Sequence, residues 1–173
     1  YVEDGLFLIG KSRGNPGETS GEVCFNTGMT GYQEILTDPS YAKQMIVMSS
    51  PHIGNYGTNN QDIESDKIFA SGFIIKSESL QPSNWRSESS LTNFLSSNEI
   101  VGIQDIDTRA LTIHIRKNGS MRGIISTEDF NIDSLKKKIS DIPNMEGQDL
   151  AIEVSRKEKR ILCNVEKPLY KVA

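Results

Sequence analysis

The stretch TGYQEILTDPSYAKQMIVM, residues 30–48, decides the fold because it joins three local signals in direct succession. Its last four residues, 45–48, form a continuous apolar run of strand length, which is typical of a central strand covered on both faces. Upstream, residues 32–36 predict a short helix. Pro39 ends that helix, because proline disfavours helical geometry at the residue before it. We therefore expect a helix, a tight turn and a core strand.

Further strand and helix patterns flank this stretch. Apolar alternation or short apolar runs predict strands at residues 22–27, 72–76, 100–103 and 121–126. Capping residues followed by helical spacing predict one helix from Ser87 to about residue 97, one from Asp107 to Gly119, and one that starts at Asn131 or Asp133 and carries Leu135 and Ile139. Because strands and helices interleave without regular βαβ alternation, the pattern predicts a mixed α/β fold whose mixed sheet has helices packed against it.

Turn-forming residues predict irregular structure in two parts of the N-terminal half. Asp4 and Gly5 indicate a hairpin turn within residues 1–10. Residues 11–21 and 51–59 are rich in glycine and in other turn-forming residues, so we expect loops there.

The C-terminal part shows little periodicity. Residues 143–169 predict a loop and a charged linker, and residues 170–173 read as the first half of a strand. A strand that stops part-way leads us to expect that another domain follows. The first residue is not methionine, which indicates that the sequence begins inside a longer chain.

Composition and charge exclude several classes of protein. The 173 residues are 36% hydrophobic and 24% charged, which suits one soluble globular domain. With a mean hydropathy of −0.41 and no apolar run near the ~20 residues that a spanning helix needs, we expect no membrane segment. The net charge of −4 gives no sign of the basic patch of a nucleic-acid binder.

The two cysteines and two histidines offer little for catalysis. Cys24 and Cys163 lack CxxC spacing, so neither a disulfide framework nor a zinc site is predicted, and a reducing cytoplasm is the expected compartment. Cys24 lies inside a strand pattern, where a buried structural cysteine is the favoured interpretation. His52 could be a base or a structural residue, and His114 is interpreted as a packing or surface residue. We expect no metal centre, because two histidines could form one only with carboxylates at close, periodic spacing, and the sequence shows none.

The turn at residues 38–41, Asp-Pro-Ser-Tyr, offers binding geometry instead of chemistry. Ser40 can present a hydroxyl and an amide to a polar ligand, or it can merely satisfy the turn, and composition leaves these two interpretations even. The glycines near residues 28–31 and 54–57 match a phosphate-binding loop only weakly, because the Gly-Lys-Ser/Thr ending and the three-glycine spacing are both missing.

Several stretches, taken together and in order, resemble the N-terminal domain of the small subunit of glutamine-dependent carbamoyl phosphate synthetase. The likeness spans about residues 1–155. The stretches are VEDGLFLIG (2–10), GEVCFNTGMTGYQEILTDPSYAKQ (21–44), SSPHIGNYGTN (49–59), DIDTRALTIHIRKNGSMRGII (105–125) and GQDLAIEVS (147–155). The ordered set makes the resemblance specific, and no single tetrapeptide does.

The resemblance implies a layered β/β/α fold of the swivelling kind for residues 1–155. Residues 156–173 would then be a linker and the truncated first strand of a class I glutamine amidotransferase domain. Such a subunit takes ammonia from L-glutamine and passes it to a large synthetase subunit. There, with ATP and Mg bound by that partner, bicarbonate and ammonia give carbamoyl phosphate for arginine and pyrimidine synthesis.

The same resemblance implies how roles are divided between domains. The sequence contains no GVCxGHQ-type nucleophile elbow, so the Cys-His-Glu machinery is expected in the following domain and no catalytic or cofactor-binding residue is expected here. In the family, the serine of the DPSY turn reaches the glutamine site of the neighbouring domain. That position is Ser40, which would help hold glutamine without needing a base.

Two other functions stay open at the level of the sequence. The chain could be a free-standing binding or adaptor domain that reuses the fold without any ligase. It could also be an independent hydrolase that uses Cys24 and His52, although this hypothesis conflicts with the buried strand position of the cysteine.

Overall fold

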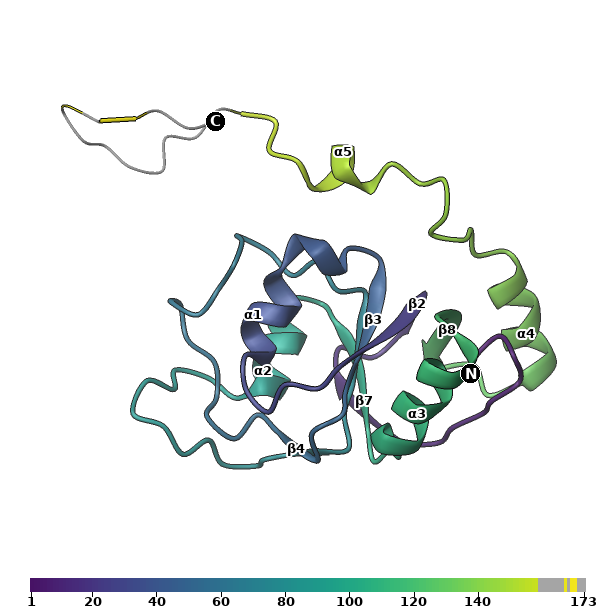
Figure 1. Cartoon of the computed structure of the whole chain (residues 1–173). Helices are drawn as coiled ribbons and strands as arrows, with labels where there is room; N and C mark the ends of the chain where they lie inside the picture. The colour runs from purple at the N-terminus through teal and green to yellow at the C-terminus, as the bar shows by residue number, and fades with distance from the viewer. Residues whose placement is uncertain (159–166, 168, 171–173) are drawn as a thin grey trace.

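The computed structural model describes residues 1–158, 167, 169 and 170, and Figure 1 shows the arrangement of their elements. The stretch that decides the fold forms α1 (Tyr32–Thr37), the 3₁₀ turn η1 (Pro39–Tyr41) and β3 (Gln44–Met48). Asp38 has an extended conformation and separates the two helical pieces, as expected for a residue before proline. The predicted succession of helix, turn and core strand is confirmed.

The described residues form one mixed sheet of six strands in the order β1-β7-β5-β3-β2-β8. The inner four strands are parallel to one another, and the outer strands β1 and β8 pair antiparallel with β7 and β2. A second, two-stranded parallel sheet joins β4 to β6. The mixed α/β class is therefore confirmed. The strands are β1 (Lys11–Gly14), β2 (Glu18–Asn26), β4 (His52–Ile53), β5 (Gly72–Ile74), β6 (Ser77–Glu78), β7 (Val101–Gln104) and β8 (Met121–Ser126).

β3 lies inside the sheet and supplies both hydrophobic cores. Met45 and Val47 pack into the cluster that contains α3 (Thr108–Asn118), whereas Ile46 and Met48 pack into the cluster beneath α1 and α2 (Leu91–Ser97). Alternate residues of a strand point to opposite faces, so an unbroken apolar run is required where both faces are covered. α4 (Ile132–Ser140) packs on β8 in a smaller third cluster.

The observed end residues confirm two of the three helices that were predicted from capping residues. Asp107 accepts a hydrogen bond from the Ala110 amide at the start of α3, which ends at Gly119 as expected. Asn131 caps α4 through the Ser134 amide, which settles the choice between Asn131 and Asp133.

The third predicted helix begins later than expected. Ser90, and not Ser87, caps α2, because backbone hydrogen bonds hold Glu88 and Ser89 against Thr58 before the helix begins.

The expectations about the N-terminal segment are confirmed only in part. Residues 1–10 turn at Asp4 and Gly5 as predicted, with the Val2 amide donating to the Leu6 carbonyl over 2.9 Å, but Val2 bridges to Gly123 and no hairpin strands flank the turn. Residues 11–21 are not one loop, since β1 and the start of β2 flank a turn at residues 15–17. β1 lies at the edge of the sheet and pairs with β7, and the start of β2 pairs with the edge strand β8. Both segments are polar and are held by backbone hydrogen bonds, so they lack the apolar alternation that predicts strands.

Three shorter elements were also missed. His52 and Ile53 form β4 within the expected loop, their partner β6 follows the strand predicted at residues 72–76, and α5 (Leu150–Val154) forms within the expected linker. All three are too short to show periodicity, and α5 buries no residue. The strand predicted at residues 170–173 lies outside the described residues except for Tyr170, as does Cys163. Across the described part of the chain, no helix is long and apolar enough to cross a bilayer.

Candidate functional site

The turn that carries Ser40 is short and well anchored, and its serine faces solvent. The Ser40 amide donates to the Asp38 carboxylate over 2.8 Å, and the Ala42 amide closes the turn on the Pro39 carbonyl over 3.1 Å. Ser40 is exposed, and within residues 1–158 its hydroxyl makes no hydrogen bond. The amide therefore satisfies the turn, while the hydroxyl is available to another molecule or domain.

Tyr41 fixes the turn to the sheet. Its ring packs against the core cluster beneath α1, and its hydroxyl accepts a hydrogen bond from the Asn26 side-chain amide over 3.1 Å. The Asn26 side-chain oxygen, Oδ1, in turn accepts from the Gly28 amide over 2.7 Å. Ser40 thus projects from a segment whose two neighbours are held in place, as a preorganised contact requires.

The helix before the turn is locked from outside its own sequence. α1 starts after Gly31, which has φ 81° and no capping side chain. The Tyr56 hydroxyl fills that role, because it accepts from the Gly31 amide over 2.6 Å and from the Tyr32 amide over 3.2 Å. The two tyrosine rings stack with centroids 4.3 Å apart, and the Tyr32 hydroxyl donates to the Gly57 carbonyl over 2.6 Å.

A second pair completes this lock. The Gln33 side chain donates to the Asn59 carbonyl over 2.5 Å and accepts from the Asn59 amide over 3.0 Å, and both residues are buried. We call the set Gly31, Tyr32, Gln33, Tyr56, Gly57 and Asn59 the tyrosine lock. It explains the two glycine-rich loops, which pair with each other through these hydrogen bonds.

Burial raises the pKa of both tyrosines in the lock, and the interaction between their hydroxyls adds to the shift at Tyr32. The two hydroxyls therefore stay protonated through the physiological pH range. They act as fixed hydrogen-bond groups, and neither is a candidate acid or base at neutral pH.

Cys24 and His52 do not form a catalytic pair. Cys24 is half-buried on β2, and burial together with the nearby Glu22 carboxylate raises the pKa of its thiol to about 12. His52 is exposed on β4, and within the described residues no hydrogen bond joins it to Cys24. A thiol that stays protonated and has no histidine hydrogen-bonded to it is not an activated nucleophile, so the geometry argues against the hydrolase hypothesis.

His114 has a structural partner. It lies half-buried on α3, where its ring contacts the Asp4 carboxylate and the Asn118 side chain. Burial raises the pKa of Asp4, but the Leu6 amide and His114 outweigh it and leave that pKa below its ordinary value. The contact ties the N-terminal turn to α3. Among the residues that the structure describes, no group of three metal-ligating side chains comes together.

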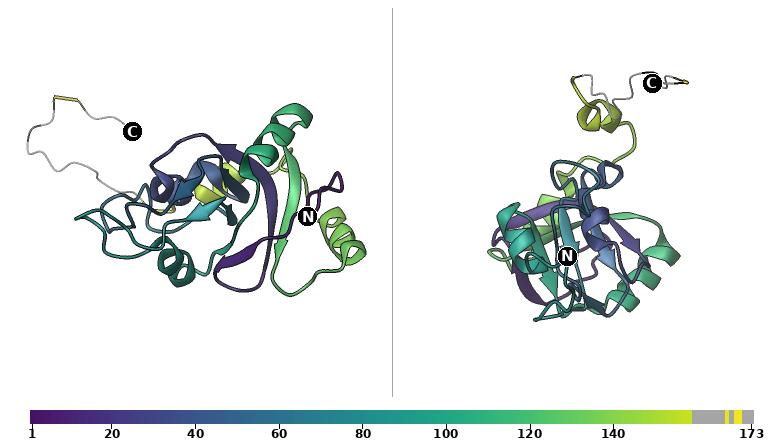
Figure 2. Two further views of the ribbon diagram at one scale, coloured as in Figure 1. Left: turned by 90° about the horizontal axis from the view of Figure 1, so that it is seen from below. Right: turned by 90° about the vertical axis from the view of Figure 1, so that its left-hand side faces the viewer.

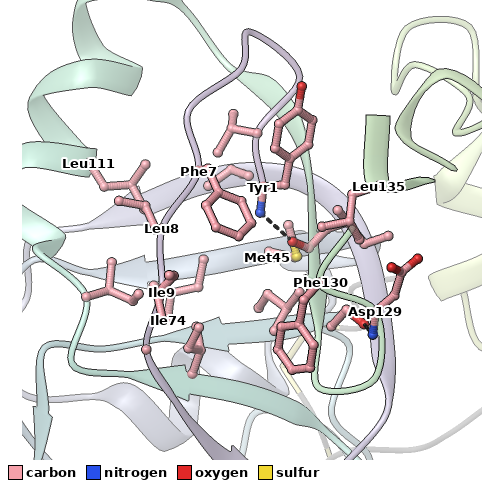
Figure 3. A pocket seen from close by; sticks show the side chains of 18 residues that line it. Tyr1, Phe7, Leu8, Ile9, Met45, Ile74, Leu111, Asp129, Phe130 and Leu135 are labelled. Carbon is pink, nitrogen blue, oxygen red and sulfur yellow. Dashed lines mark hydrogen bonds between the residues drawn. The ribbon is translucent and has the colours of Figure 1, made fainter. Parts of the chain in front are cut away.

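An apolar recess lies between the N-terminal segment and the sheet. Figure 3 shows Phe7, Leu8, Ile9 and Phe130 around it, and Asp129 at its rim is the one charged side chain among its lining residues. The Ser134 hydroxyl and the Lys138 ammonium hold the pKa of Asp129 at about 2. Asp129 therefore stays charged and paired, and the recess offers apolar contact without a catalytic group.

The end of the described chain returns to the Ser40 turn. Figure 1 and the right-hand view of Figure 2 show α5 standing apart from the body of the domain, above the turn between α1 and β3. Lys43 makes the connection: its ammonium lies 2.7 Å from the Glu153 carboxylate on α5 and donates to the Gln148 side chain over 3.2 Å. We call residues 142–154 the strap.

Comparison with known proteins shows which family this domain resembles. A profile described as "Carbamoyl-phosphate synthase small chain, CPSase domain" matches residues 1–125. The chain belongs to the carbamoyl-phosphate synthase small chain family. It is 54% identical over 154 residues to the carbamoyl phosphate synthase small chain of Maridesulfovibrio salexigens, 52% over 157 residues to that of Thermotoga maritima, and 50% over 157 residues to that of Aquifex aeolicus.

These small-chain alignments cover about nine-tenths of this sequence but only 40–42% of the relatives. The chain therefore spans about two-fifths of the length of the curated relatives that it matches. The resemblance inferred from the ordered motifs is confirmed at the level of the family.

The sequence predicted that Ser40 lies on a turn, but it did not predict the contacts that hold this turn in place. The tyrosine lock joins Gly31 and Tyr32 to Tyr56 across 24 or more residues, and only the recurrence of tyrosine beside glycine in both loops could have suggested it. The role of Lys43 had no signal, because its left-handed backbone, φ 61°, and its partners more than 100 residues away are products of tertiary structure.

Proposed function

We propose that this chain is the N-terminal domain of the small subunit of a glutamine-hydrolysing carbamoyl phosphate synthetase. In this proposal it docks on the large subunit in the cytoplasm. It also helps the following amidotransferase domain to hold L-glutamine through Ser40. Ammonia released there, with bicarbonate and ATP on the large subunit, gives carbamoyl phosphate for arginine and pyrimidine synthesis. The domain contributes binding and positioning, and the chemistry belongs to the other domains.

The observation that carries the proposal is the placement of Ser40. Its hydroxyl is exposed and unpaired within residues 1–158, on a turn whose neighbours are anchored. The strap brings the C-terminal part of the described chain to the same end of the domain, with Lys43, three residues after Ser40, in contact with α5. The segment that leads to a following domain would therefore leave this domain at the end that carries the Ser40 turn.

The chemistry of Ser40 suits a substrate contact. A serine hydroxyl can donate to a carboxylate or accept from an ammonium group, and free glutamine carries both. A contact made by a turn from a neighbouring domain adds affinity without a base. A binding role without catalysis also fits Cys24, the candidate nucleophile among the described residues, because its thiol stays neutral.

Replacement of Ser40 by alanine in the complete enzyme tests the proposal. Ser40→Ala is expected to raise the KM for glutamine about tenfold, the effect of losing one hydrogen bond to a charged group, and to leave ammonia-dependent synthesis unchanged. Steady-state kinetics with glutamine or ammonium chloride as nitrogen source separates the two.

Two control variants sharpen this test. Ser96→Ala changes an exposed serine on α2 and should leave both activities intact. Ser40→Thr keeps a hydroxyl and should retain more of the glutamine affinity than Ser40→Ala. If Ser40→Ala has the same KM for glutamine as the parent enzyme, the binding role of Ser40 is wrong. If the small subunit does not associate with the large subunit in sedimentation at micromolar concentration, the docking role is wrong.

A further inference from the structure

We propose that Lys43 is a positioning residue that clamps the strap onto the Ser40 turn and so sets where the following domain meets Ser40. This inference rests on the proposed function. It begins with the route of the chain: α4 lies beside the edge strand β8, and the strap runs from there to α5 above the Ser40 turn (Figure 1).

Few contacts hold the strap to the body of the domain. α5 buries no residue: Ile152 is 71% exposed, and Leu150 and Val154 are only half-buried, so hydrophobic packing holds α5 weakly among the described residues. At the near end, the Arg122 guanidinium donates to the Ile142 carbonyl over 2.6 Å. At the far end, Lys43 contacts both Gln148 and Glu153.

The strap is itself ordered around the Lys43 contact. The Oε1 atom of Gln148 accepts the hydrogen bond from Lys43, and its Nε2 atom donates to the Asn144 carbonyl over 2.7 Å. The Asp149 carboxylate caps α5 through the Ile152 amide, and so presents Glu153 on a formed helical turn. The lysine thus binds two points of a structured segment, one on each side of the α5 cap.

Lys43 is placed for this role by the turn it follows. Its backbone adopts φ 61°, a left-handed conformation that costs free energy for a residue with a side chain. Its carbonyl lies against Gly21, where an added Cβ would come within 2.4 Å. Close contact with β2 therefore holds the backbone of Lys43 in this conformation, and its side chain reaches Gln148 and Glu153 on the strap.

The test uses the complete small subunit assembled with its large subunit. Lys43→Met keeps most of the aliphatic stem and removes the charge. It is expected to raise the KM for glutamine about two- to fivefold, because an exposed ion pair contributes little energy. The kcat with glutamine and all ammonia-dependent parameters should stay at parent values, since a positioning residue does not touch the reacting atoms.

Rescue variants distinguish a clamp from a general effect on the fold. Lys43→Arg should keep the KM near the parent value, and Lys43→Glu combined with Glu153→Lys should recover part of what Lys43→Glu alone loses. Lys138→Met is the matched control, because Lys138 is 41% exposed against 43% for Lys43 and also has two partners. That control should leave the KM for glutamine unchanged.

The outcomes separate this inference from the proposed function. A raised KM in Lys43→Met, with rescue by the reversed pair, supports the clamp. If Ser40→Ala raises the KM for glutamine but Lys43→Met does not, the clamp is wrong and the function of Ser40 stands. If neither variant changes it, both are wrong. An equal rise in Lys138→Met would also overturn the clamp.

Discussion

The tyrosine lock and the strap hold the two sides of the same turn by opposite means. In the lock, Tyr32 and Gln33 are fully buried, and the Tyr32 hydroxyl and both polar atoms of the Gln33 side chain have hydrogen-bond partners in the facing loop. In the strap, Lys43 and Glu153 are 43% and 55% exposed in their side chains and meet in water. Stability therefore resides on the side of α1, whereas the position of α5 depends on exposed contacts.

This difference follows from what each kind of contact costs when it is broken. A buried amide or hydroxyl that loses its partner is left without water, and the fold bears its full desolvation penalty. An exposed lysine that loses a carboxylate is simply hydrated. The lock should accordingly keep one conformation, while the position of the strap can adjust.

The largest expected effect concerns Cys24, which packs against the cluster that the lock closes. Its thiol has a pKa raised from near 9 to about 12, and the thiolate is the reactive form. At pH 8, alkylation of Cys24 by iodoacetamide should be about a thousandfold slower in the folded chain than in the unfolded chain. Peptide mapping by mass spectrometry resolves Cys24 from Cys163.

The same shift fixes the sign of the pH effect on stability. Because the folded state holds the thiol proton more tightly, the stabilisation is fully present below the ordinary pKa near 9. It is lost as the pH rises toward about 12. Alkylation at pH 8 that matches the unfolded rate would mean that the cluster beneath α1 is open, and the contrast with the strap would disappear.

Gln33→Leu should have the next largest effect. The substitution keeps the apolar stem and leaves the Asn59 amide and carbonyl without their buried partner. We expect the free energy of unfolding to fall by about 2–4 kcal/mol, as measured by denaturant titration of the complete small chain. Gln61→Leu, at an exposed glutamine of the same loop, should change it by less than about 0.5 kcal/mol. Equal effects would show that the burial of Gln33 is unimportant.

Tyr56→Phe should have a smaller effect, because stacking on Tyr32 is kept and only the hydroxyl is lost. The amides of Gly31 and Tyr32 would lose their acceptor, for which we expect about 1–2 kcal/mol of destabilisation. Hydrogen exchange should accelerate at those two amides before it does along β3. Unchanged protection there would mean that the hydroxyl does not cap α1.

The smallest expected effect is that of Lys43→Met on stability. Loss of an exposed ion pair should lower the free energy of unfolding by less than about 0.5 kcal/mol, in the same titration. A loss of 2 kcal/mol or more, the size typical of core changes, would make the strap part of the core and would remove the distinction drawn above.

Much of the fold could be predicted because some segments carry their own physical reason. The apolar run at residues 45–48 had to be covered on both faces, and Asp107 with Gly119 defined both ends of α3. β1 and β4 could not be predicted in this way. Their residues are polar or few, and only backbone hydrogen bonds to partners elsewhere make them strands.

By itself, the sequence determined the mixed α/β class, the family and the position of Ser40 on a turn, because local backbone preferences, apolar patterning and ordered motifs are properties of neighbouring residues. Only the tertiary structure decided that Tyr56 caps α1, that Cys24 stays a neutral thiol, and that Lys43 meets Glu153. Each of these depends on groups brought together across 25 to 110 residues or on burial by them, and such contacts exist only once the chain has folded.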